Sequence, residues 1–159
     1  MNQLILHPTA TYMEQEQDTY QEIIKEENKQ ILLGCSRARH QLGNSEIEWV
    51  IEILSPNEVA PPLPPTTRIY RFEFEDNRHI HLQEWIDNIL PIIHQETGRG
   101  LLHCREGRSR SPSILLAYLM RYHRMTYDDA LTLVRSKRPV VRPNPGFERQ
   151  LRAMQPSHT

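Results

Sequence analysis

The sequence predicts an α/β fold, a three-layer sandwich in which helices flank a central, mostly parallel sheet of about five strands. Three observations predict it. Short apolar or alternating runs that are typical of strands recur at 31–34, 47–54, 70–74 and 101–103. Segments with apolar residues at helical spacing alternate with the later strands, at 82–94, 110–122 and 126–136. The chain of 159 residues is long enough for one domain with its own core.

The N-terminal 28 residues differ from the rest because they are rich in Gln and Glu. We expect residues 1–28 to form an extension that is loosely ordered or docked on the domain. Within it, residues 20–24 could begin a short helix. The domain itself is expected to span residues 29–155.

The first half of the domain carries the strand signals. Residues 31–34 form a short apolar run that ends at a glycine, and 47–54 is a largely buried strand in which Glu48 and Glu52 interrupt apolar positions. Five prolines between 56 and 67 indicate a loop. Aromatic residues then alternate at 70, 72 and 74, which predicts a further strand.

The second half carries the helices. The helix over 82–94 contains Pro91, which should bend or weaken it. Gly98 and Gly100 indicate a turn before the strand at 101–103. Thr126 can cap the helix over 126–136, with Asp129 three residues later. A turn at 143–146 precedes a short terminal helix over 147–154.

Composition narrows the class of protein. No apolar run approaches the roughly 18–20 residues that span a bilayer, and the N-terminus lacks the pattern of a signal peptide. The chain has two cysteines, which favours a reducing, cytoplasmic setting over a disulfide framework. Residues 99–152 hold 12 basic and 4 acidic residues, which suggests an anionic substrate. We expect the protein to be a monomer. Nucleic-acid binding is not expected, because this half lacks aromatic residues interleaved with its basic residues.

A strand, a glycine-containing loop and a helix follow one another around Cys104, and this order is typical of phosphate binding. Loop amides and the helix N-terminus should stabilise a thiolate at Cys104, whose reference pKa near 8.5 falls to about 3.5–7.5 in such places. Arg110 can place its planar fork on two phosphate oxygens, and Ser111 can donate a hydrogen bond to the sulfur. The residues expected to bind phosphate are Arg105, Glu106, Gly107, Arg108, Ser109 and Arg110.

The run from His103 to Ser111, HC-x-x-G-x-SRS, resembles the signature of the dual-specificity subgroup of the cysteine-dependent protein tyrosine phosphatases. The resemblance covers residues from about 31 to 151. It implies a phosphatase that needs no metal and no organic cofactor. A zinc site is also disfavoured by the residues themselves, because no second cysteine pair is present. Further matches to the family are at 31–34, 117–120, 138–139, 143–147 and 150–151.

The resemblance also implies a general acid on a loop before the signature. Asp76 matches that position, and Glu73 and Glu75 are close alternatives. Asp76 would protonate the departing alcohol and then activate the water that hydrolyses a cysteinyl phosphate. His103 is expected to hydrogen-bond the loop, and Asn144 to reach it from the C-terminal turn.

The substrate stays open at this point. We favour a phosphoprotein, with phosphotyrosine and also phosphoserine or phosphothreonine as targets. An anionic phospholipid headgroup, such as a phosphoinositide, is the alternative because Arg105, Arg108 and Arg142 add charge. A pseudophosphatase that only binds phosphorylated partners is less favoured, since Cys104 and Arg110 are both present. Cys35 could form a disulfide with an oxidised Cys104.

Overall fold

Five strands form one mixed sheet in the order β1-β2-β5-β3-β4. β2, β5, β3 and β4 run parallel, whereas β1 pairs with β2 in the antiparallel direction. The computed structural model describes residues 19–42 and 46–154, and the structural statements below concern these residues. The strands are β1 (Tyr20–Glu26), β2 (Lys29–Gly34), β3 (Trp49–Leu54), β4 (Arg68–Glu73) and β5 (Gly98–His103).

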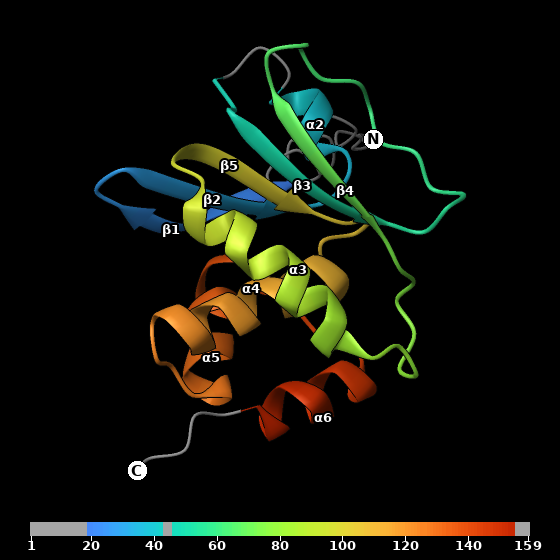
Figure 1. Cartoon of the computed structure of the whole chain (residues 1–159), viewed down its shortest axis with the longest axis vertical. Coiled ribbons are helices and arrows are strands. Elements are labelled where there is room, and N and C mark those ends of the chain that lie inside the picture. The colour runs from blue at the N-terminus through green and yellow to red at the C-terminus, as the bar shows by residue number, and fades with distance from the viewer. Residues whose placement is uncertain (1–18, 43–45, 155–159) are drawn as a thin grey trace, which may run out of the picture.

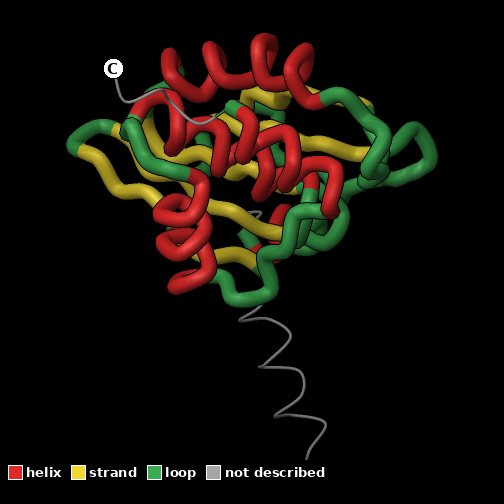
Figure 2. Tube along the Cα trace, turned by 90° about the horizontal axis from the view of Figure 1, so that it is seen from below, coloured by secondary structure: helices red, strands yellow, loops and turns green. Residues whose placement is uncertain are grey.

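Helices cover both faces of the sheet, and Figure 1 shows that the two layers are unequal. The four long helices lie on one side, where α4 contacts three of the strands as well as α3, α5 and α6. Among the described residues, the short helix α2 lies on the other side, and the view from below in Figure 2 shows the longer helices in front of the strands. The helices are α2 (Ala38–Gln41), α3 (Leu82–Gln95), α4 (Arg110–Tyr122), α5 (Tyr127–Lys137) and α6 (Pro145–Ala153). The predicted α/β sandwich is therefore confirmed.

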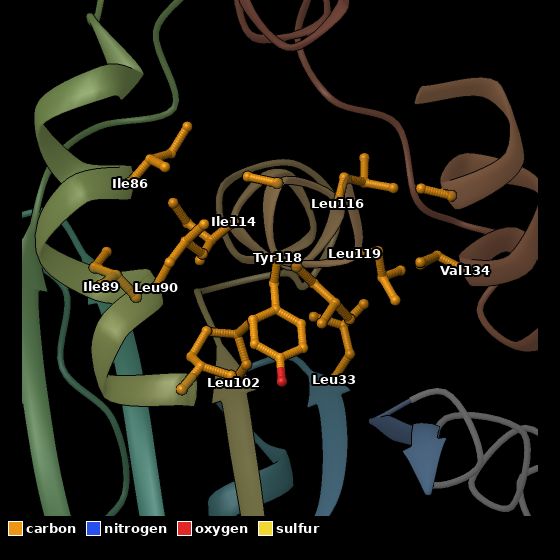
Figure 3. Close-up of a cluster of buried hydrophobic side chains, with 14 of the residues drawn as sticks. Leu33, Ile86, Ile89, Leu90, Leu102, Ile114, Leu116, Tyr118, Leu119 and Val134 are labelled. Carbon is orange, nitrogen blue, oxygen red and sulfur yellow. The ribbon is translucent and has the colours of Figure 1, made fainter. Parts of the chain in front are cut away.

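The main core lies between the sheet and the four long helices. Tyr118 of α4 is at its centre, with Leu33 of β2 and Leu102 of β5 around its ring (Figure 3). Every residue of α4 from Arg110 to Met120 is buried. A helix that is buried on all sides cannot shift along the sheet without opening cavities, so its first residue, Arg110, has a fixed position at the end of β5.

The short helix expected over residues 20–24 is wrong, because these residues belong to β1. β1 closes a hairpin with β2, and Ile23 and Ile24 are both buried in it. The register shifts between Glu22 and Ile24, which lets consecutive isoleucines contact the core. Pairing with the edge of the sheet has overridden the local helical pattern. Thus part of the segment 1–28 belongs to the sheet, and residues 1–18 lie outside the described residues.

The turn expected at Gly98 and Gly100 is also wrong, since both glycines lie inside β5. Gly98 has a φ of +83°, and residues 98–103 all pair with β2. A Cβ at Gly100 would lie 2.0 Å from the ring of Trp49, so this glycine makes room for a large core side chain. Close packing therefore explains a residue that sequence patterns assign to turns.

The remaining elements follow the expectations closely. Residues 55–67 form a loop, and α3 continues through Pro91 to Gln95. The Asp129 amide donates to the Thr126 hydroxyl at the start of α5, as the capping pattern predicts. None of the helices in the described part of the chain has the length and hydropathy that crossing a bilayer would require.

Candidate active site

The loop from Cys104 to Ser109 connects the carboxyl end of β5 to α4, and its carbonyl oxygens are all bonded to the surrounding protein. The Ser36 hydroxyl and amide donate to the carbonyls of Cys104 and Arg105. The guanidinium of Arg138 donates to the next two carbonyls, those of Glu106 and Gly107, at 3.0 and 2.9 Å. The carbonyls of Arg108 and Ser109 accept from the amides of Arg142 and Ser113.

With its carbonyls directed outward, the loop presents its amides to its own interior. Among the described residues, the one hydrogen bond from an amide of residues 105–109 is that of Gly107, whose nitrogen donates to the sulfur of Cys104 at 3.2 Å. The hydroxyl of Ser111 donates to the same sulfur at 3.2 Å. Two donors directed at one sulfur stabilise negative charge on it. The loop is therefore a preformed anion site with a cysteine at its base.

Gly107 permits this curvature. It has a φ of +67°, in the left-handed region that L side chains disfavour. A Cβ there would also lie 2.5 Å from the backbone of Gly34. The obstructing atoms are the carbonyl carbon and oxygen of Gly34, so a side chain at this position would force the loop and β2 apart.

His103 lies under the loop and is fully buried. Its Nδ1 is 3.0 Å from the carbonyl of Cys104, and since a carbonyl only accepts, Nδ1 carries the proton. The Nε2 atom is buried and has no hydrogen-bond partner among the described residues. Burial lowers the pKa of His103 from 6.5 to about 4, against the hydrogen bond to Cys104, which raises it. His103 therefore supports the loop as a neutral ring.

Arg110, the first residue of α4, is held by a carboxylate that sequence reasoning missed. Its NH1 and NH2 atoms donate to the two oxygens of Glu58 at 2.7 and 3.2 Å, and NH1 also reaches the carbonyl of Phe74 at 3.3 Å. The fork from Arg110 lowers the pKa of Glu58 from 4.5 to about 2. The Nε atom of Arg110 has no hydrogen bond to a described residue, so one edge of the guanidinium can still take an anion.

Asp76 lies on the loop after β4 and contacts the loop that connects Cys104 to α4. Its Oδ1 accepts from the Ser109 hydroxyl at 2.7 Å and from the side-chain amide of Asn144 at 2.8 Å. The Asn144 backbone amide donates in turn to the Ser109 hydroxyl, and its Oδ1 caps α6 by accepting from Phe147. The structure thus brings together Asp76, Ser109 and Asn144, which are far apart in sequence. Glu75 makes no contact of this kind.

Cys35 is a free, buried thiol that follows Gly34, and Gly34 pairs with His103, so both cysteines directly follow paired residues of β2 and β5. Among the described residues, no cluster of three His, Cys, Asp or Glu side chains is arranged to hold a metal ion.

Sequence reasoning missed Glu58 as a partner of Arg110 and Arg138 as the support of the loop. Glu58 lies in the proline-rich loop between β3 and β4, where no periodic signal exists. Arg138 was noted only for its resemblance to a C-terminal signature, although it is 3% exposed and donates to two loop carbonyls. The sequence around Arg138 gave no sign of burial, because charged residues are usually exposed.

Comparison with known proteins agrees with this geometry. The family model for the dual specificity phosphatase catalytic domain matches residues 31–157. The human "Dual specificity protein phosphatase 21" is 39% identical over 112 residues, which cover 62% of this chain and 59% of that protein. A probable rhodanese domain-containing dual specificity protein phosphatase of Dictyostelium discoideum is 34% identical over 120 residues, covering 74% of this chain and 25% of its own length.

Solved structures give the same result for the fold. The crystal structure of human DUSP28 superposes with a TM-score of 0.72 at 26% identity, covering 84% of this chain and 90% of that one. A human tyrosine phosphatase-like serine/threonine/tyrosine-interacting protein also gives 0.72, at 25% identity over 86% of this chain and 95% of that chain. The alignments span about 60% of the first curated relatives. On the family model and the loop that carries its signature, the chain belongs to the dual specificity phosphatase catalytic domain family.

Proposed function

We propose that this protein is a phosphatase that hydrolyses phosphomonoesters on proteins, with Cys104 as the nucleophile. The observation that carries the proposal is the loop whose carbonyls all bond outward while the sulfur of Cys104 accepts two hydrogen bonds at its base. Such a loop binds the phosphate dianion through its amides. The phosphate contacts come from residues 105–109, together with the free edge of Arg110.

The first step transfers the phosphoryl group to Cys104. The sulfur attacks phosphorus, an S–P bond forms as the P–O bond to the alcohol breaks, and Asp76 donates its proton to the departing oxygen. Arg110 stabilises the charge that develops on the transferred phosphoryl oxygens. Asp76 has a place for this role because Ser109 and Asn144 hold one of its oxygens beside the loop.

The second step regenerates the enzyme. Asp76, now ionised, takes a proton from water as the water oxygen attacks phosphorus. The S–P bond breaks and Cys104 leaves as a thiolate, which Ser111 stabilises through its hydrogen bond at 3.2 Å. No step needs a metal or an organic cofactor. Two free thiols, Cys35 and Cys104, suit a reducing, intracellular setting for the enzyme, which we propose acts as a monomer.

Hydrolysis of an aryl phosphate, of phosphotyrosine and phosphothreonine peptides and of phosphoinositide vesicles tests the proposal. We expect the wild-type protein to hydrolyse the aryl phosphate and the peptides. Cys104→Ser should abolish turnover but still bind phosphate esters, and the control variant Cys35→Ala should keep its activity. Absence of any hydrolysis by the wild type would indicate a phosphate-binding module, and turnover of vesicles without peptides would indicate a lipid phosphatase.

A further inference from the structure

The chain between β4 and α3, residues 74–81, carries Asp76, and we call it the β4–α3 segment. Its first residue is fixed in the core, because the buried ring of Phe74 stacks on Trp85 with 4.9 Å between the ring centroids. Residues 75–79 are all exposed, so burial of side chains does not hold the part that contains Asp76. The position of Asp76 therefore depends on contacts of the segment with other elements.

α6 lies along the second half of this segment, and the half-buried side chain of Gln150 bonds to two backbone groups there. Its Nε2 atom donates to the carbonyl of Ile80, and its Oε1 atom accepts from the amide of Leu82, both at 2.8 Å. One turn earlier on α6, a Cβ at Gly146 would lie 2.0 Å from the carbonyl oxygen of Arg78. Helix and segment are therefore in direct backbone contact.

The bond to Leu82 also completes the start of α3. The first amides of a helix have no partner within the helix, and a side chain at the N-cap commonly accepts from one of them. The N-cap of α3 is His81, whose side chain makes no such hydrogen bond. Gln150 supplies an acceptor from another helix instead, so the end of the β4–α3 segment and the start of α3 are fixed to α6 together.

α6 holds the segment at two points, since Asn144 at its N-terminus donates to the Asp76 carboxylate at 2.8 Å. The helix itself is anchored, because Phe147 is fully buried and its ring makes an edge contact with Phe74 at 6.3 Å between centroids. A chain held at two points on a fixed helix has fewer conformations than a chain held at one. A displacement of about 1 Å can cost about a hundredfold in rate, so the second point, at Gln150, matters for proton transfer.

We propose that Gln150 is a positioning residue, which acts through the β4–α3 segment to keep Asp76 where it can protonate the leaving oxygen. This inference rests on the proposed function, with Asp76 as the general acid. Both hydrogen bonds of Gln150 go to the segment, and it has none to residues 104–111, which bind the phosphate in that proposal. Its loss should therefore slow proton donation and leave phosphate binding unchanged.

The test measures kcat/KM for aryl phosphates whose phenols have pKa values from about 5 to about 10, because poor leaving groups need the proton most. Gln150→Met keeps the size of the side chain but removes both hydrogen bonds. We expect it to lower kcat/KM by about ten- to thirtyfold for the poorest leaving group and by less than about twofold for the best. Inhibition by inorganic phosphate should be unchanged. Gln83→Met, on the exposed face of α3, is the matched control and should behave as the wild type.

A double-mutant cycle separates positioning from a structural role. Because Gln150 acts through Asp76, Gln150→Met should change kcat/KM by less than about twofold when Asp76→Asn has already removed the acid. If the two losses multiply instead, Gln150 does not act through Asp76 and the inference is wrong. Gln150→Glu keeps the acceptor for Leu82 but loses the donor to Ile80, so it should lie between Gln150→Met and the wild type.

Thermal unfolding checks that each variant is folded, and Gln150→Glu carries the test if Gln150→Met is not. A dependence on the leaving group equal to that of the wild type, in the folded variant, would overturn the positioning role and leave the phosphatase proposal intact. If Asp76→Asn itself kept the wild-type dependence, the acid would lie elsewhere and the inference would fall with that assignment. A wild-type protein that hydrolyses no aryl phosphate would overturn the proposed function as well.

Discussion

The protein contains two arginine–carboxylate forks at opposite ends of the parallel strands, and they differ in what the arginine can still bind. At the carboxyl end, Arg110 and Glu58 pair at 2.7 and 3.2 Å. At the amino end, Arg68 and Glu96 pair at 2.9 and 2.6 Å. The side chain of Arg110 is 8% exposed, whereas that of Arg68 is 53% exposed.

The difference shows how one interaction serves two purposes. The Glu96 fork links the start of β4 to the end of α3, and its arginine faces water, which screens the pair. The Glu58 fork holds a buried guanidinium beside loop amides that have few acceptors of their own. Only the second arrangement leaves a desolvated cation facing an anion site, where an electrostatic interaction is strong. Variants at the carboxyl end should therefore alter activity, and variants at the amino end should alter stability alone.

The largest effect is expected from Asp76→Asn. The asparagine oxygen can still accept from Ser109 and Asn144, so the variant removes the proton donor and little else. We expect kcat to fall by about 10²- to 10⁴-fold for substrates with poor leaving groups. Phosphopeptide kinetics over a range of pH measures this, with Glu75→Gln as the neighbouring control. If kcat fell by a comparable factor in Glu75→Gln while Asp76→Asn stayed active, the general acid would be Glu75 and not Asp76.

The next effect concerns the stability of the folded state and comes from His103, at the carboxyl end of β5. Since the pKa of His103 is about 4 when folded and about 6.5 when unfolded, the unfolded chain binds more protons between these values. The folded state should therefore lose stability as pH falls from 6.5 to 4, by up to about 3 kcal/mol from this group. Urea unfolding at several pH values measures the slope.

His103→Asn is the matched variant for that measurement, because its side-chain amide can still donate to the Cys104 carbonyl but does not titrate. It should show a shallower dependence on pH over this range than the wild type. Identical slopes in the two proteins would mean that other groups cause the acid sensitivity.

Glu58→Gln should have a smaller effect on catalysis. Glutamine keeps the shape and one acceptor oxygen but loses the charge and half of the fork, so Arg110 should be less well oriented. We expect kcat/KM for an aryl phosphate to fall by about ten- to a hundredfold. Glu58→Asp keeps the carboxylate on a shorter side chain, so its kcat/KM should be lower than that of the wild type. A rise in kcat/KM, with tighter binding of inorganic phosphate, would show instead that Glu58 competes with the substrate.

The smallest effect is expected at the amino end. Glu96→Gln breaks the matched fork with Arg68, and we expect kcat/KM to change by less than about twofold because exposed pairs contribute little. Thermal unfolding should show a small loss of stability. A large loss of activity in this variant would break the distinction between the two ends of the sheet.

Local patterns sufficed for much of this molecule. The period of two in β3 and β4 and the helical spacing in α3 and α4 identified these elements from nearby residues alone. The loop from Cys104 to Ser109 and the start of α4 at Arg110 were also predictable, because a loop between a strand and a helix must place its amides and the first helical residue together. Asp76 was assigned by resemblance; the structure places it against Ser109, and its role as the general acid stays a prediction.

What the sequence could determine by itself is the local chemistry: a cysteine, a glycine and an arginine at fixed spacing around an anion site. Only the tertiary structure decided which distant groups complete it. Glu58 reaches Arg110 from an irregular loop, Arg138 supports the loop from 31 positions along the chain, and residues 20–26 form a strand because β2 offered an unpaired edge. The physical reason is common to all three: burial and pairing partners depend on contacts between segments far apart in the chain, and periodicity within one segment carries no information about them.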